Sequence, residues 1–238
     1  MLTKQSLIRE ETSKRIYSTE NDEHLIVEFL DALDFNDSDS KRTVKGIGAI
    51  NNNIAAYLQN YLEGYHISTH FVRSISENEM LVKNTRPIPI EVVIQNVSND
   101  SLTNRFGIES DQELQQPVIE YYWKNADRGN PLINGSHAVA IGLLRAEELR
   151  GFERLIQKAN AVLLAFFFRR QLKLRELVLH FAVYKKTLVI TSNLSLDTIS
   201  LMDPQSKMQY NEFLTTKEDA EIISALATLQ QTIVGENV

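Results

Sequence analysis

The sequence contains no cysteine, which excludes disulfide bonds, thiolate metal sites and thiol nucleophiles. It also lacks a basic excess: 25 Lys and Arg stand against 31 Asp and Glu, a formal net charge of −6. A chain of this charge has no broad positive field, so we expect no nucleic-acid partner. The longest apolar run, Ala161–Phe168, is too short to span a bilayer, and no membrane association is expected. Because residues 1–11 carry no apolar signal core, a cytoplasmic location is expected.

The few histidines give no sign of a metal centre. Their spacings differ from those typical of metal ligands, so the sequence predicts no metal site and leaves each histidine to the core or to solvent. The five are His24, His66, His70, His137 and His180.

Short strand-like segments precede the long helices, which predicts an α+β fold in two lobes. Leu25–Phe29, Met80–Lys83 and Ile88–Gln95 are rich in β-branched and other apolar residues and are predicted as strands. Pro87 and Pro89 are expected to break the chain before the last of these, because proline has no N–H to donate. We therefore predict a β-rich N-terminal lobe over residues 1–86 and an α+β C-terminal lobe over residues 87–238.

Apolar residues at helical spacing predict helices over residues 50–64, 146–170 and 216–234. The last is expected to open with a capping box of Thr215 and Glu218, and its buried stripe to begin at Ala220. A β-hairpin is predicted to turn at Lys185 and Lys186. Gly46 and Gly48 precede the first helix and fit either an anion cradle or the geometry of helix entry.

Two neighbouring segments carry a family resemblance. Residues 91–97 read EVVIQNV and residues 101–107 read SLTNRFG. They resemble the EVVVRN…GSLxKRLG signature of SAICAR synthetases, which use ATP to join aspartate to a phosphoribosyl-aminoimidazole carboxylate. Other segments resemble the family in the same order: residues 14–19, 31–36 (DATAFN), 46–52 (GKGRLNN), 79–83, 130–133 (DPLI) and 195–203 (SPDxxRLWD).

The resemblance implies the family's fold: an antiparallel N-terminal lobe, a larger C-terminal lobe and an interlobe cleft that holds the site. It also implies ATP and magnesium as cofactors and a homo-oligomer, commonly a dimer. Matching positions supply the candidate residues. They are Lys14, Lys83 and Glu91 for a nucleotide, and Ser101, Arg105, Asp197 and Thr198 for a substrate phosphate.

The charged positions of the family motifs are the ones that differ here. In the hairpin over the ATP phosphates, the family's glycine and lysine fall on Glu11 and Thr12, so an anion replaces a residue that lets backbone N–H groups approach phosphate. The lysine of GKG falls on Ile47, and the arginines of EVVVRN and SPDxxR fall on Gln95 and Ser200. In the family's VDFKLEFG strand the aspartate, lysine and metal-side glutamate fall on Glu176, Val178 and His180, and the acidic pair of ADE falls on Ser192 and Asn193.

These changes remove five cations and the carboxylates expected to hold magnesium, which prefers oxygen ligands. A hydrogen bond to a charged group is worth about 1.5–3 kcal/mol, so several kcal/mol of anion binding should be lost. Phosphoryl transfer depends on positioned cations and metal. We therefore expect the family's ligation to be lost or altered, with catalytic residues unknown and neither ATP nor magnesium a firm cofactor.

Three functions stay open from the sequence. The chain could act on a nucleotide-like small molecule held by Ser101, Arg105 and Lys14. It could instead be a pseudoenzyme that binds or regulates a protein partner, because the losses leave the core stripes intact. It could also remain a SAICAR synthetase in which Lys41, Arg42 and Lys45 replace the GKG lysine. The sequence also leaves open whether His180 is a new functional group or a space-filling residue.

Overall fold

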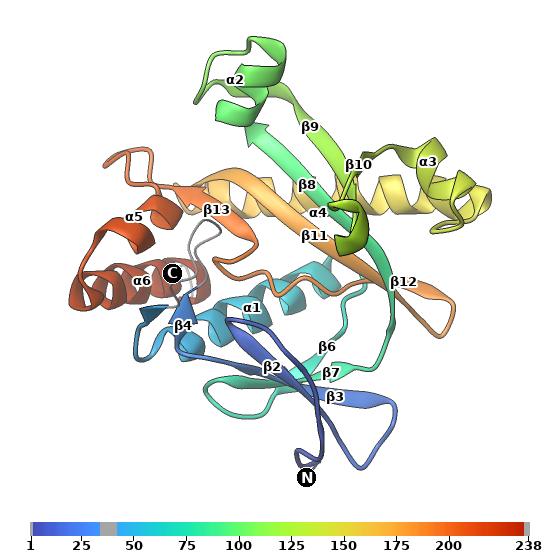
Figure 1. The fold of residues 1–238 in the computed structure, drawn as a ribbon. Coiled ribbons are helices and arrows are strands. Elements are labelled where there is room, and N and C mark those ends of the chain that lie inside the picture. The colour runs from blue at the N-terminus through green and yellow to red at the C-terminus, as the bar shows by residue number, and fades with distance from the viewer. Residues whose placement is uncertain (1, 34–41, 236–238) are drawn as a thin grey trace. The chain divides into compact units, whose positions relative to one another are not determined.

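The computed structural model describes residues 2–33 and 42–235 (Figure 1). Its contacts divide the chain into two compact units. The first unit comprises Met1–Thr85, Asn193–Asp197 and Tyr210–Val238, and the second comprises Arg86–Ser192 and Thr198–Gln209. The chain thus passes from the first unit to the second one residue before the predicted boundary at 86/87. The C-terminal residues Tyr210–Val238, however, belong to the first unit together with the N-terminal residues. The lobes of residues 1–86 and 87–238 stay a prediction.

The first unit is built on an antiparallel sheet in the order β1-β2-β3-β7-β6. Alternate residues of its strands face α1 and form the core cluster that includes Val27, Phe29, Ala55, Met80 and Val82. The strands and the helix are β1 (Leu7–Glu10), β2 (Lys14–Ser18), β3 (His24–Phe29), β6 (Phe71–Ser74), β7 (Glu79–Lys83) and α1 (Ile47–Gly64); β4 (Ala32–Leu33) pairs with β5 (Arg42–Thr43).

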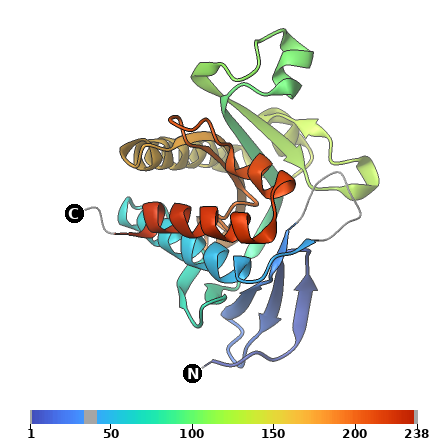
Figure 2. The same cartoon turned by 90° about the vertical axis from the view of Figure 1, so that its left-hand side faces the viewer.

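Two helices close this unit, α5 (Tyr210–Thr216) and α6 (Asp219–Val234). Helix α6 packs beside α1, as both views show (Figure 2). The predicted capping box at the start of the last helix is wrong, because Thr215 lies inside α5 and the N-cap Glu218 makes no side-chain cap bond. A helix break at residues 217–218 separates the two, which helical periodicity alone does not reveal.

The second unit is built on a six-stranded sheet with the path β10-β9-β8-β11-β12, and β13 pairs with β11. Its three long central strands place mainly apolar residues on one face, whereas the other face carries Glu, Gln, His and Tyr residues beside Val93, Val118 and Val178. The strands are β8 (Arg86–Val97), β9 (Glu113–Trp123), β10 (Leu132–Ile133), β11 (Lys173–Tyr184), β12 (Thr187–Ile190) and β13 (Ile199–Met202). The helices are α2 (Asp100–Phe106), η1 (Ala126–Arg128), α3 (Gly135–Ala140) and α4 (Ala146–Arg169).

Helix α4 covers the apolar face of this sheet (Figure 1). The predicted amphipathic stripe is confirmed, because Phe152, Ile156, Leu163 and Phe167 are all fully buried. On the facing strand β8, Val92 and Ile94 are buried whereas Glu91 and Val93 are half-exposed. Strand alternation therefore leaves a half-exposed polar face on the side away from α4.

The expected break at Pro87 and Pro89 is wrong, because β8 runs through both prolines from Arg86. Two features of the sheet tolerate them. This end of β8 lies beyond the register with β9, which begins at Ile90, and so pairs only with β11. The register with β11 also shifts between His180 and Phe181, so that Pro89 lies in a bulge.

The predicted hairpin is confirmed: β11 turns into β12 at Lys185 and Lys186, which have φ values of 45° and 71°. Such left-handed pairs match the twist of two-residue hairpins. Helices and antiparallel sheets together confirm the predicted α+β class. No helix in the described ranges is long and apolar enough to cross a membrane.

Candidate functional site

The first candidate region is the turn between β1 and β2 in the first unit. Glu11 N donates to Lys14 O at 2.9 Å, which closes a four-residue hairpin turn. Ser13, at the tip, donates its hydroxyl to Asp197 Oδ2 at 2.8 Å and accepts at its carbonyl from Leu30 N at 2.8 Å. These two hydrogen bonds fix the turn to the segments around Asp197 and Leu30.

Lys14 is the cation that the resemblance retains in this turn. Its Nζ lies 3.1 Å from Glu11 Oε2 and donates to Asn193 Oδ1 at 3.2 Å. Burial would raise the pKa of Glu11, but the Lys14 ammonium, with Arg9, brings that pKa below its ordinary value. The lysine predicted to contact a nucleotide is therefore bound to a carboxylate of its own hairpin.

Two of the residues predicted for a substrate phosphate, Asp197 and Thr198, lie on either side of a change of unit along the chain. Asp197, in the first unit, accepts from Ser13 as described above. Thr198, in the second unit, is buried and accepts at its carbonyl from Val178 N at 2.7 Å. The backbone of Thr198 therefore has a structural role, since it binds β11 at Val178.

Lys83 lies at the end of β7, where its Nζ donates to Thr69 O at 2.8 Å and lies 3.6 Å from Glu63 Oε1. A pocket of about 360 Å³ lies beside it, lined by Asn60, Glu63, Phe71, Val72 and Lys83. Glu63 also accepts from Thr69 N at 2.7 Å. The lysine is thereby part of the junction between the end of α1 and the sheet.

Helix-entry geometry accounts for the two glycines ahead of α1. Gly46 has φ +94°, which a side chain would strain, and a Cβ on Gly48 would lie 2.7 Å from the Phe29 carbonyl oxygen. Gly48 N donates to Asp31 Oδ1 at 3.0 Å, so a carboxylate already occupies this helix N-terminus. Ile47, at the lost lysine position, is fully buried.

Of the three cations proposed to replace the GKG lysine, Arg42 is paired with a carboxylate. Arg42 Nε donates to Asp219 Oδ1 at 2.9 Å, at the start of α6. Lys45 is exposed, and Lys41, like residues 34–36 of the DATAFN-like segment, lies outside the described residues.

The second candidate region is the polar face of the sheet in the second unit, formed by β8, β9 and β11 (Figure 1). The strand register aligns its residues in three rows. Across β9, β8 and β11, the rows are Tyr122, Glu91 and His180; Glu120, Val93 and Val178; and Val118, Gln95 and Glu176.

His180 and Glu91 form the centre of the first row. His180 Nε2 lies 2.9 Å from Glu91 Oε2, and Lys124 Nζ lies 2.9 Å from the same oxygen. The buried Ser192 hydroxyl accepts from His180 N at 2.6 Å, which fixes the backbone of the histidine. The hydrogen bond from His180, aided by Lys124, lowers the pKa of Glu91 to about 2 although burial opposes the shift.

The third row also pairs its polar groups internally. Gln95 Nε2 donates to Glu176 Oε2. Burial raises the pKa of Glu176, an effect that this bond and Arg175 oppose. Ser200, at the lost arginine position, lies opposite Glu176 on β13.

Arg105 is held beside the same face. Its Nη1 and Nη2 donate to the two carboxylate oxygens of Glu120 at 2.7 and 3.0 Å, and its Nε donates to Ser101 O at 3.3 Å. Tyr122 donates to Glu120 Oε2 at 3.2 Å. The two retained substrate-side residues, Ser101 and Arg105, are thus brought together, with the arginine already bidentate to a carboxylate.

The polar face as a whole is acidic. Three carboxylates, of Glu91, Glu120 and Glu176, face two cations, Lys124 and Arg105, each already in an ion pair. Among the residues that the structure describes, no group of three or more His, Asp or Glu side chains could hold a metal ion.

Replacing Glu91 by glutamine should weaken the acid sensitivity of the fold. Because folding lowers the pKa of Glu91 from 4.5 to about 2, its stabilising contribution is complete above pH 4.5 and disappears as the pH falls towards 2. Urea unfolding of Glu91→Gln between pH 7 and pH 2 should show lower stability at neutral pH and a shallower decline. The same substitution at the exposed Glu109 should follow the unsubstituted protein, and equal profiles for all three proteins would contradict the assignment.

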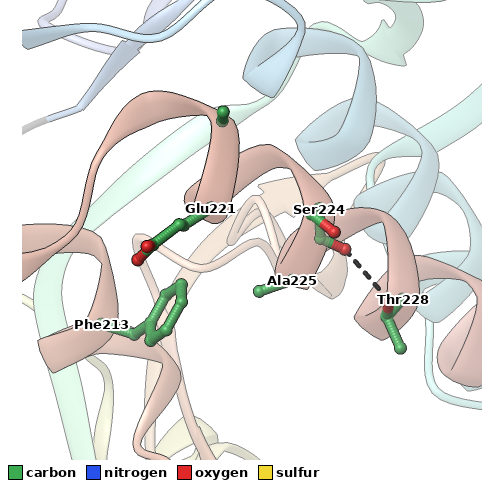
Figure 3. A pocket seen from close by; sticks show the side chains of 6 residues that line it. Phe213, Glu221, Ser224, Ala225 and Thr228 are labelled. Carbon is green, nitrogen blue, oxygen red and sulfur yellow. Dashed lines mark hydrogen bonds between the residues drawn. The ribbon is translucent and has the colours of Figure 1, made fainter.

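A further pocket in the first unit lies between α5 and α6 (Figure 3). Its volume is about 480 Å³, and it is lined by Phe213, Ala220, Glu221, Ser224, Ala225 and Thr228. Ala220 was predicted in the buried stripe of α6, and this is wrong because it is exposed. One phenyl ring, small side chains and one carboxylate give this pocket no evident reactive group.

Sequence reasoning missed Glu120 and Lys124, which pair with Arg105 and Glu91. The alternation of Glu120 and Tyr122 with Ile119 and Tyr121 is a period-of-two signal that could have placed both on the polar face. Which residue each would meet depends on the strand register, which the sequence does not state.

Comparison with known proteins gives one consistent result. The model of the SAICAR synthetase family matches residues 7–218. The phosphoribosylaminoimidazole-succinocarboxamide synthase of Chloroherpeton thalassium is 35% identical over 222 residues, which cover 92% of this chain and 94% of that protein. The enzyme of the same name from Clostridium acetobutylicum is 30% identical over 235 residues, or 99% and 100% of the two chains.

Solved structures agree with the sequence relatives. The crystal structure of phosphoribosylaminoimidazole-succinocarboxamide synthase from Ehrlichia chaffeensis superimposes with a TM-score of 0.89 at 26% identity, covering 98% of this chain and 100% of that one. A SAICAR synthetase in complex with ADP gives a TM-score of 0.88 at 27% identity, with 97% and 98% covered.

Proposed function

The chain belongs to the SAICAR synthetase family, and we propose that it is a diverged member in which the ATP- and magnesium-dependent ligation is lost or severely reduced. The observation that carries this proposal is the polar face of the second unit. Where the family resemblance implies a lysine and a metal-side glutamate, β11 has Val178 and His180. Both changes occur on a face whose carboxylates outnumber its cations.

The charge balance explains why a phosphate would bind poorly there. An incoming phosphate meets Glu91, Glu120 and Glu176, and Arg105 would have to leave a bidentate carboxylate to bind it. His180 forms a hydrogen bond with Glu91. Its imidazole does not provide the oxygen ligand that magnesium prefers. Loss of even two charged hydrogen bonds, at about 1.5–3 kcal/mol each, corresponds to roughly a hundredfold to ten-thousandfold weaker anion binding.

We propose that the polar face of the second unit binds a nucleotide-like molecule of lower charge. The middle row offers the apolar Val93 and Val178 between two rows of hydrogen-bonding side chains. A flat, uncharged ring with donors and acceptors at its ends suits this surface better than a triphosphate. Ser101 and Arg105 remain exposed beside it.

Calorimetric titration with ADP and ATP, with and without magnesium, tests the proposal. The SAICAR synthetase solved with ADP serves as the positive control. We expect no magnesium-dependent binding by this chain at nucleotide concentrations up to about 1 mM, a limit that corresponds to about −4.1 kcal/mol. Magnesium-dependent binding near micromolar would contradict the proposal, because it would require the missing cations to be replaced elsewhere.

A further inference from the structure

The turn between β1 and β2 holds an anion of its own beside the retained lysine. Glu11 and Lys14 occupy the two ends of the turn, and the closing hydrogen bond from Glu11 N to Lys14 O brings their backbones together. The Glu11 side chain then reaches back to Lys14 Nζ at 3.1 Å. Arg9 approaches the other carboxylate oxygen of Glu11, at 3.5 Å.

Lys14 is better suited to hold an anion than an ordinary surface lysine. Only 17% of its side chain is exposed, so its ammonium is less screened by water than that of a solvated lysine. Asn193 fixes it from a second segment of the chain. An ammonium has three N–H donors, and Glu11 and Asn193 account for two of them.

The turn is also rigid in the region where an anion would sit. Ser13 is tethered both to Asp197 and to Leu30 N, so the backbone cannot swing away without losing two hydrogen bonds. Glu11 itself is ionised at neutral pH, because the Lys14 ammonium and Arg9 bring its pKa below the ordinary value against the effect of burial. A second anion at Lys14 would have to displace this carboxylate or lie beside it.

We propose that Glu11 is the resident anion of a site formed by Lys14, Asn193 and the hairpin turn, and that removing its charge opens this site to an inorganic polyphosphate. The proposal rests on the proposed function, since it explains how the hairpin is closed to a phosphate chain although Lys14 is kept. It goes further, because it states that the barrier is one side chain and that the underlying site is intact.

Binding of tripolyphosphate tests this inference without a nucleoside or magnesium. The substitution Glu11→Gln keeps the size of the side chain and removes its charge. Repulsion between two anions a few ångströms apart falls steeply once one is neutralised, so we expect affinity to rise at least about tenfold. The gain should shrink as salt is added, because screening weakens the contact between Lys14 and the anion.

A matched control is available at the next residue. Glu10 lies in the same hairpin and accepts from Arg15 Nη2 at 2.7 Å, so Glu10→Gln makes the same change in net charge without touching Lys14. We expect it to change tripolyphosphate affinity less than about threefold, as a change in overall field would. The double variant Glu11→Gln with Lys14→Gln should lose the gain, and circular dichroism should show each variant folded.

Three results would overturn the inference: equal affinities for the Glu11 and Glu10 variants, no gain in the Glu11 variant, or a gain that persists without Lys14. The failure of the proposed function has a separate signature. Tight magnesium-dependent ATP binding by the unsubstituted chain would refute that proposal, whereas the comparison of the two glutamate variants alone decides the role of Glu11.

Discussion

Replacing Phe152 by alanine is expected to lower the free energy of unfolding by about 3–5 kcal/mol. Phe152 is fully buried in α4 and packs edge-on against Phe181 of β11, with ring centroids 4.7 Å apart. Tyr121 of β9 contacts its other side at 5.6 Å. The ring therefore joins the helix to two central strands of the sheet that carries the polar face.

The size of this effect follows from burial and not from the residue type. Phe168, on the same helix, is 81% exposed, so Phe168→Ala should change the free energy of unfolding by no more than about 0.5 kcal/mol. Urea unfolding monitored by circular dichroism compares the two variants directly. Similar losses of stability in both would show that α4 does not cover the sheet as described.

The largest functional effect is expected in the ligation reaction itself. Removing one preorganised charge-stabilising donor from an active site typically costs about 10²–10³ in rate. Such groups act together, so their losses do not multiply. With Gln95, Val178 and His180 in place of family residues on one sheet face, we expect a kcat/KM at least about a thousandfold below that of an active relative.

The periodic elements of the fold were predictable because their signals are local. The stripe of α4 and the turn at Lys185 and Lys186 depend only on residues close in sequence, and both are confirmed. The prediction of a break at Pro87 and Pro89 was wrong, because proline disrupts a strand only where the N–H of that position would pair with a neighbouring strand. A one-sided strand end with a bulge leaves those positions without a bond to lose.

The break between α5 and α6 shows a second limit. Thr215 and Glu218 have the spacing of a capping box, but that spacing also fits the end of one short helix and the start of the next. A local capping pattern indicates only where a helix can begin. The observed start of α6 also depends on its packing against α1.

The candidate residues were easier to find than their partners. Lys14, Glu91 and Arg105 could be named from the motifs, and Glu11 could have been paired with Lys14 because both flank one short turn. Lys124 and Glu120 could not be assigned as partners, since a shift of one residue in the register of β9 would turn both to the other face. The motifs thus identified the candidate residues, and the sheet register shows which residues pair with them.

Turnover is the measurement that tests the central claim most directly. The purified chain and the Chloroherpeton thalassium synthase, 35% identical to it, would be assayed side by side with ATP, magnesium, aspartate and the carboxylated aminoimidazole ribotide. Formation of the succinocarboxamide product would be followed. A kcat/KM at least about a thousandfold below that of the relative is the predicted result. A value within about tenfold of the relative would contradict the account, because that gap is only about 1.4 kcal/mol.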